Sequence, residues 1–208
     1  MTLLLPGIQA GILEFARLLP LLPDAVAVPL PDVDDDSLAG LAARVLAEVG
    51  PGPHDVIAAS FGGLVARAMP SGAVRKLVTI GTLPERTAAA VRSGRAGRLL
   101  RWTPDRLYRE LYAGRVRDSL LEDGATPEMI EGWRPPARAV LAARLRAIGA
   151  WELPDRLPAG STWMWGATDR FVTWDEARVR ALGGEPLVVP GGHRPHLSHP
   201  SEVARWVR

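Results

Sequence analysis

The chain has 208 residues, of which 47% are hydrophobic and 23% charged, a composition typical of one globular domain with a sizeable core. The high apolar content excludes a disordered chain, and the absence of cysteine excludes disulfide scaffolds, thiol chemistry and zinc sites built on cysteine. The 25 basic and 23 acidic residues leave a net charge of only +2.

The first 30 residues are apolar enough to require a check for an export signal. No basic residue lies near the N-terminus, Pro6 and Pro20 interrupt the apolar run, and Glu14 and Arg17 place charges inside it. No stretch of 18 uninterrupted apolar residues occurs anywhere in the sequence, so no membrane span is expected. We therefore expect a cytoplasmic protein.

Short apolar runs alternate with helical patterns through the first 84 residues. Strand composition is found at Thr2–Leu5, Ala25–Leu30, Val56–Ala59 and Leu77–Ile80, and the helical patterns between them are Leu13–Leu22, Ser37–Val49 and Phe61–Met69. Repeated strand–helix–strand units predict a parallel sheet with right-handed crossovers.

The alternation of strand and helix patterns ends at Pro84. Residues 85–160 are rich in arginine and have helical periodicity without a convincing strand. Two amphipathic helices are predicted at Asp105–Leu121 and Ala137–Ile148, after which strands resume at Thr162–Trp165 and Pro186–Val189, with a last helix at Pro200–Val207. We predict an α/β core of residues 1–84 and 161–208, interrupted by a helical insertion at 85–160.

Positive charge is concentrated at the start of this insertion. Residues 86–117 contain nine arginines and two acids, Asp105 and Glu110, which gives a local charge of 9 − 2 = +7. Such a face either docks an acidic partner, such as an acyl carrier protein, or is a solvated helix surface. Nucleic-acid binding is disfavoured because no recognition motif and no interleaved stacking aromatics accompany the arginines.

A serine follows the apolar run Val56–Ala59 directly and precedes a glycine pair and a helical pattern. A tight strand-to-helix turn forces such a serine into a strained backbone conformation, and it needs small residues two positions before and after. Ala58 and Gly62 occupy these positions. The turn would raise the Ser60 hydroxyl above the carboxyl edge of the sheet and direct helix N–H groups at an anion. Taken alone, the pattern is equally consistent with Ser60 as a helix N-cap.

Two further polar residues follow predicted strands. Asp169 lies in the turn after Thr162–Trp165, and His193 lies just after Pro186–Val189. Because the carboxyl ends of parallel strands are where an α/β sheet gathers its ligands, both side chains are expected near Ser60.

Four motifs in this order resemble those of the α/β-hydrolase fold family. Residues 3–7 resemble its oxyanion loop, 59–63 its nucleophile elbow, 166–172 its acid turn and 192–200 its histidine loop, and the chain order serine, aspartate, histidine is also the family's. The resemblance implies a three-layer α/β-hydrolase fold with about six mostly parallel strands, and it implies that residues 85–160 form a helical cap.

Two replacements depart from the family pattern without removing a catalytic atom. Ala58 and Pro6 stand where many members carry glycine and histidine. The chain also opens directly with the strand before the oxyanion loop, so the family's N-terminal hairpin is not expected.

The resemblance implies a role for each site residue. Ser60 would attack a carbonyl carbon, His193 would accept its proton, and Asp169 would orient the imidazole. The backbone N–H groups of Ile8 and Phe61 would hold the developing oxyanion. No cofactor is implied.

Other residues compete for these roles. His196 and His199 are alternative bases, but the loop should be turning towards the last helix at these positions, so we interpret them as structural or pocket-lining. Asp175 and Glu85 are alternative acids. A metal site formed by the two histidines with His193 is disfavoured because no carboxylate cluster accompanies them.

For the residues of the substrate pocket, the sequence leaves two interpretations open. Gln9, beside the oxyanion loop, either presents a polar group to substrate or is solvated. Trp102, Tyr108, Tyr112 and Trp133 of the insertion either line an apolar acyl pocket or belong to the core, which is the commoner place for aromatic residues at helical spacing.

These features predict a cofactor-independent serine hydrolase that cleaves a carboxylic ester or thioester of modest size through an acyl-enzyme. Narrower alternatives within the family are a carrier-protein thioesterase, a pimeloyl methyl ester esterase-like enzyme and a C–C bond hydrolase. A non-hydrolytic lyase or cyclase, or a binding module on the same fold, represents a different class of function.

Overall fold

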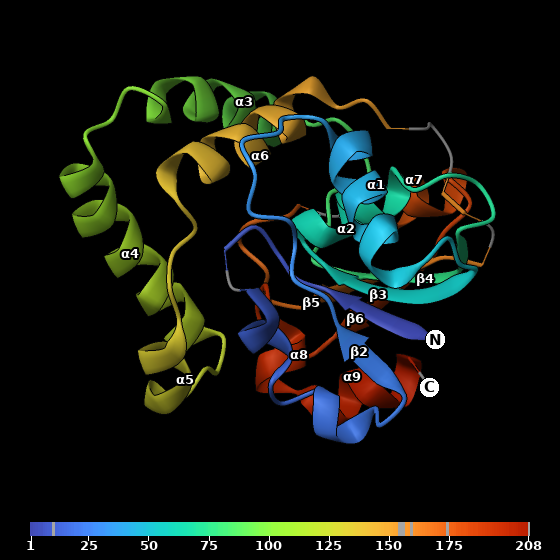
Figure 1. The fold of residues 1–208 in the computed structure, drawn as a ribbon. Helices are drawn as coiled ribbons and strands as arrows, with labels where there is room; N and C mark the ends of the chain where they lie inside the picture. Colours follow the sequence, from blue (N-terminus) through green and yellow to red (C-terminus); the bar gives the residue numbers. More distant parts are fainter. Residues whose placement is uncertain (10, 154–156, 159, 174, 208) are drawn as a thin grey trace.

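A parallel β-sheet forms the centre of the molecule (Figure 1). The computed structural model describes residues 1–9, 11–153, 157–158, 160–173 and 175–207. Within these residues the sheet has six strands, β1 (Thr2–Leu5), β2 (Ala25–Ala27), β3 (His54–Ala59), β4 (Val74–Ile80), β5 (Thr162–Gly166) and β6 (Glu185–Val189). Their order is β2-β1-β3-β4-β5-β6, and each neighbouring pair is parallel. The predicted six-stranded parallel sheet is confirmed.

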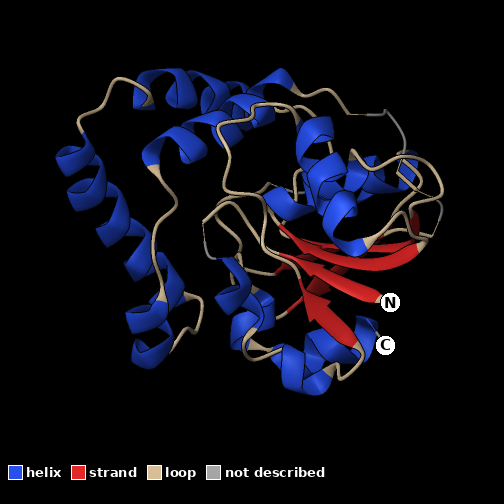
Figure 2. Cartoon of the chain, viewed as in Figure 1, coloured by secondary structure: helices blue, strands red, loops and turns tan. Residues whose placement is uncertain are grey.

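Helices cover both faces of this sheet (Figure 2). They are the 3-10 helices η1 (Gly11–Phe15) and η2 (Leu19–Leu21) and the α-helices α1 (Leu38–Val49), α2 (Phe61–Arg67), α3 (Ala88–Leu100), α4 (Asp105–Glu122), α5 (Pro127–Gly132), α6 (Arg138–Ala150), α7 (Glu176–Ala181), α8 (Pro195–Ser198) and α9 (Pro200–Val207).

Alternation along the strands creates two cores, one on each face. Leu3 and Leu5 of β1 pack into a cluster that includes apolar residues of α1, α2 and α7. Leu4, between them, packs on the other face with Phe15 of η1 and Val203 of α9. Helix, sheet and helix therefore form the three expected layers.

Two of the predicted elements have a different form in the structure, and α3 and α5 were not predicted as separate helices. The helix expected at Leu13–Leu22 is instead two short 3-10 helices, because Pro20 has no N–H and its ring blocks a continuous α-helix. Strand β2 ends at Ala27, although the apolar run continues to Leu30. Val28 still donates to the carbonyl of Leu4, but the following Pro29 has no N–H to extend the ladder.

The segment between β4 and β5 is helical, as predicted, and consists of α3 to α6. Helix α3 packs closely on α6, and α4 and α5 stand beside the sheet (Figure 1). The C-terminal half of α4 contributes Val116 and Leu120 to a cluster with Trp133 and with Leu197 of α8. This cluster joins the segment to the loop that carries His193. None of the helices within the described residues is long and apolar enough to cross a bilayer.

Candidate active site

Ser60 lies at the sharp turn between β3 and α2. Its backbone has φ 47° and ψ −113°, a region that residues with a Cβ rarely adopt. Its N–H donates to the carbonyl of Ile80 at 2.7 Å, and its own carbonyl accepts from the Thr82 hydroxyl at 2.9 Å. A Cβ on Gly62 would stand 2.5 Å from the carbonyl oxygen of Leu5, so the turn requires the glycine that the sequence places there.

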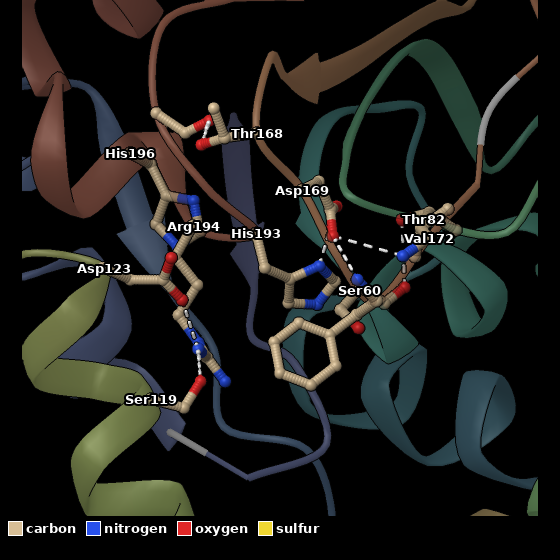
Figure 3. A network of polar contacts seen from close by, with 12 residues as sticks. Ser60, Thr82, Ser119, Asp123, Thr168, Asp169, Val172, His193, Arg194 and His196 are labelled. Atoms are coloured by element: carbon tan, nitrogen blue, oxygen red, sulfur yellow. Dashed lines mark hydrogen bonds and ion pairs between the residues drawn. The ribbon is translucent and has the colours of Figure 1, made fainter.

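A buried carboxylate orients the ring of His193. Its Nδ1 lies 2.9 Å from Oδ2 of Asp169, and Oδ1 of Asp169 accepts from the backbone N–H groups of Phe171 at 2.7 Å and Val172 at 3.1 Å. Burial alone would raise the pKa of Asp169, but the bonds from His193 and the two N–H groups hold it below its ordinary value. In Figure 3 the ring has Asp169 on one side and Ser60 on the other.

One cavity of about 220 Å³ brings the predicted loops together. Ser60 and His193 line it with Ile8, Gln9 and Phe61. Its walls come mainly from α3, α6 and neighbouring loops, through Leu64, Leu83, Ala89, Ser93, Leu145, Ile148, Phe171 and Val172. The structure therefore places Ser60, His193 with its carboxylate partner, and the backbone of Ile8 and Phe61 around one small, mostly apolar space.

Two charged residues also line this cavity, and sequence reasoning missed both. Glu14 is 1% exposed, and its Oε2 accepts the N–H of Gly7 at 2.6 Å. Its Oε1 lies 3.5 Å from Nε of Arg194 and 3.4 Å from Nε2 of His196. Burial raises the pKa of Glu14, but His196, Arg194 and the Gly7 N–H together hold it below its ordinary value. A charge inside the apolar run 11–22 was the available signal.

Arg194 joins the histidine loop to α4 (Figure 3). Its Nη1 donates to Oδ2 of Asp123 at 2.6 Å and to the hydroxyl of Ser119 at 3.1 Å. Its Nη2 lies 3.4 Å from Oε1 of Gln9. Since Glu14 and Asp123 both face this guanidinium, its charge is compensated within the protein.

The four aromatic residues predicted for the pocket lie elsewhere. Trp102 is 83% exposed at the turn between α3 and α4. Tyr108 is buried and donates to the carbonyl of Pro136 at 2.6 Å, while burial raises its pKa to about 12. The ring of Tyr112 stacks on that of Tyr108, with centroids 5.1 Å apart. Trp133 is buried, and its indole N–H donates to the carbonyl of Gln9 at 2.8 Å.

The alternative acids and bases have other partners. Glu85 pairs with Nε of Arg178 at 2.7 Å, and Asp175 caps α7 by accepting the N–H of the same residue at 3.1 Å. His199 is exposed, with Nδ1 2.9 Å from the hydroxyl of Ser198. Of the candidate acids, Asp169 is the one that meets His193.

Comparison with solved structures shows the same fold in proteins of different activity. Similar structures are a thioesterase domain from the curacin biosynthetic pathway (TM-score 0.65, 17% identity, 99% of this chain and 90% of that chain covered) and a bottromycin epimerase in complex with bottromycin A2 (TM-score 0.71, 20% identity, 99% and 88% covered). An enol-lactonase from Burkholderia xenovorans is also similar (TM-score 0.70, 13% identity, 99% and 88% covered). At these identities the likeness concerns the fold alone.

Comparison of sequences gives the family. No curated protein matches the chain significantly. The model of the alpha/beta hydrolase family matches residues 3–206, which include all six strands except the first residue of β1. Because this match spans nearly the whole sequence and the sheet has the arrangement that the motifs imply, the chain belongs to the alpha/beta hydrolase family.

Proposed function

We propose that the protein is a serine hydrolase that cleaves a carboxylic ester or thioester through an acyl-enzyme, with α3 to α6 acting as its cap. The observation that carries the proposal is the 2.9 Å contact between His193 Nδ1 and the buried Asp169, beside a cavity that Ser60 also lines. This contact orients Nε2 of the ring for proton transfer.

Acylation begins when Ser60 Oγ attacks the substrate carbonyl carbon while Nε2 of His193 takes the hydroxyl proton. The carbonyl π electrons move to oxygen, and the N–H groups of Ile8 and Phe61 stabilise the resulting oxyanion. The carbonyl then reforms, the bond to the alcohol or thiol breaks, and the leaving group takes the proton from His193.

Deacylation repeats these steps with water. Water gives one proton to His193 as its oxygen attacks the acyl carbon, and collapse of the second tetrahedral intermediate breaks the bond to Ser60 Oγ, which takes that proton back. The products are the free acid and the regenerated serine. Asp169 keeps the imidazole oriented and stabilises its protonated form in both halves.

The cavity favours a short, uncharged acyl group. Its volume of about 220 Å³ is at or below the small end of ligand pockets. Arg194 is the cationic side chain among the lining residues, and it already faces Glu14 and Asp123. We therefore expect neutral short-chain esters to react faster than esters whose acyl group ends in a carboxylate.

For the partner, we propose that an acidic acyl carrier protein docks on the exposed arginines of α3. Within the described residues, Arg92, Arg95 and Arg98 are exposed and have no ion-pair partner. The nearby Leu99 and Trp102 are 74% and 83% exposed and would supply apolar contact.

Replacing Arg92, Arg95 and Arg98 together by glutamate tests this docking face. The triple variant should have a lower kcat/KM for a carrier-bound thioester, while its kcat/KM for the matching pantetheine thioester should be unchanged. Equal rates on the carrier substrate would exclude this docking face.

Hydrolysis of p-nitrophenyl esters from acetate to laurate tests the activity itself. Ser60→Ala and His193→Gln should lower kcat by orders of magnitude, with His199→Gln as the exposed histidine control. Asp169→Asn should be strongly impaired, whereas Asp175→Asn keeps the cap of α7 and should behave as wild type. Undiminished turnover by Ser60→Ala would remove the proposed nucleophile and with it the mechanism.

A further inference from the structure

Three side chains, two of them more than 120 positions away in sequence, hold the backbone of residues 7–9. Gly7 donates its N–H to Glu14 of η1 at 2.6 Å. The carbonyl of Ile8 accepts from Nη1 of Arg144 on α6 at 3.1 Å, and that of Gln9 accepts from the Trp133 indole at 2.8 Å. A surface loop would ordinarily bond to water or to its own neighbours, so this arrangement is built by the rest of the fold.

The positions of these contacts matter because peptide units are planar. The N–H of Ile8 belongs to the unit between Gly7 and Ile8. Glu14 fixes the unit before it, through the N–H of Gly7, and Arg144 fixes the unit after it, through the carbonyl of Ile8. With both neighbouring units held, the Cα atoms of Gly7 and Ile8, between which the unit with the Ile8 N–H is suspended, stay in fixed positions.

We propose that Glu14 and Arg144 are positioning residues that together aim the Ile8 N–H at the oxyanion. This inference rests on the proposed function, because it assigns a purpose to the support of that donor. Neither side chain acts on the substrate; each acts through a peptide unit adjacent to the donor.

Both side chains are charged and buried, a costly arrangement that requires compensating contacts. Arg144 is 6% exposed, and besides Ile8 it donates from Nη2 to the carbonyls of Leu30 at 3.3 Å and Pro31 at 3.0 Å. Hydrogen bonds that involve a charged group are stronger than neutral ones. They suit a donor that must already be in place when negative charge develops, since preorganisation is what makes such a donor effective.

Arg144 lies on the same helix as part of the cavity wall. Its neighbours on α6, Leu145 and Ile148, line the cavity. Helix α6 therefore contributes both to the wall of the cavity and to the support of the Ile8 carbonyl.

Phosphonylation of Ser60 by a fluorophosphonate tests this without knowledge of the natural substrate. A P–O bond forms to Ser60, fluoride leaves, the serine proton leaves through His193, and the developing anionic oxygen occupies the oxyanion hole. Mass spectrometry gives the inactivation constants kinact and KI for wild type, Arg144→Met and Glu14→Gln. We expect Arg144→Met to lower kinact at least tenfold with KI within about twofold, and Glu14→Gln to lower it less because the amide still accepts from Gly7.

Arg138→Met is the matched control. Arg138 lies on the same helix and also donates to backbone carbonyls, those of Leu100 and Arg101, but it does not reach the oxyanion loop. It should keep wild-type kinact. Arg144→Lys provides a second measurement if the methionine variant does not fold. Lysine keeps the positive charge, but its single ammonium cannot donate in all the directions that the guanidinium does, so we expect an intermediate kinact.

The outcomes separate the two proposals. If wild type is not labelled at Ser60, or Ser60→Ala is labelled equally, the proposed function fails. If wild type is labelled and the folded Arg144 variants retain its kinact, the function stands and the positioning role is wrong. An equal loss in Arg138→Met would also overturn the positioning role, because the effect would then come from the stability of the helices around α6.

Discussion

Among single residues, Ser60, the proposed nucleophile, is set apart from its surroundings by backbone strain. A φ of 47° costs a residue with a Cβ about 1–3 kcal/mol in a conformation this sparsely populated. Glycine escapes that cost. We therefore expect Ser60→Gly to be about 1 kcal/mol more stable towards urea than Ser60→Ala, although both lack the nucleophile.

Ser93 supplies the control for this comparison, because it lies inside α3 with a helical backbone. There the order should reverse, with Ser93→Gly less stable than Ser93→Ala by about 1 kcal/mol. If alanine is the more stable substitution at both positions, the turn at Ser60 is not strained.

A site residue could be predicted from the sequence when the pattern of its neighbouring residues determines its position in the fold. Ser60 directly follows β3, and Asp169 and His193 lie in the loops after β5 and β6, so strand patterns alone placed them at one edge of the sheet. Arg144 reaches Ile8 across 136 positions, and nothing near it in sequence records that contact. Trp102 shows a different failure, because it lies at the turn between α3 and α4, where helical spacing says nothing about which side chains face inwards.

At the scale of elements, two of the helices that line the cavity, α3 and α6, pack directly on each other. A Cβ on Gly94 would stand 2.8 Å from Cα of Gly149, so the helices touch backbone to backbone. Gly94→Ala should force them apart and destabilise the protein by about 1–3 kcal/mol, as overpacking does. Because both helices line the cavity, the preferred p-nitrophenyl ester should also shift to a longer acyl chain.

Gly114 of α4 is the matched position, because nothing lies within 4 Å of a Cβ added there. Gly114→Ala should raise stability by roughly 1 kcal/mol through helix propensity and leave the chain-length profile unchanged. A profile that shifts equally in both variants, or in neither, would contradict the role assigned to the contact between α3 and α6.

Element prediction succeeded where one local pattern decided the structure. The apolar runs identified every strand of the described sheet, because each is bounded by turn residues and the central strands β1, β3, β4 and β5 are largely buried on both faces. It failed at Leu13–Leu22, where apolar spacing suggested a helix but Pro20 and the buried Glu14 impose short turns. There the tertiary contact of Glu14 with Gly7 outweighs the local pattern.

At the scale of the molecule, Glu14 lies where four segments converge. From its own η1 it contacts the loop of residues 7–9 through Gly7, the start of α8 through His196 and, through Arg194, the end of α4 at Asp123. Acid that protonates this carboxylate weakens contacts between all of these segments at once. Loss of the Glu14 charge should therefore affect global stability as well as the active site.

The sign of this effect follows from the pKa of Glu14, which the fold lowers from 4.5 despite its burial. A lowered pKa in the folded state contributes stability that is fully present above pH 4.5 and is lost as the pH falls through the folded-state value, because the unfolded chain then binds more protons. Glu14→Gln should accordingly be less stable than wild type at pH 7, and the two urea midpoints should converge as the pH falls below 4.5.

Asp169 remains in both proteins, so each retains an acid-dependent loss of stability from its lowered pKa, and the difference between the two stability curves isolates Glu14. Glu48→Gln, at an exposed position of α1, should follow the wild-type curve. Parallel curves for Glu14→Gln and wild type down to pH 3 would show that the convergence of segments at Glu14 does not depend on its charge.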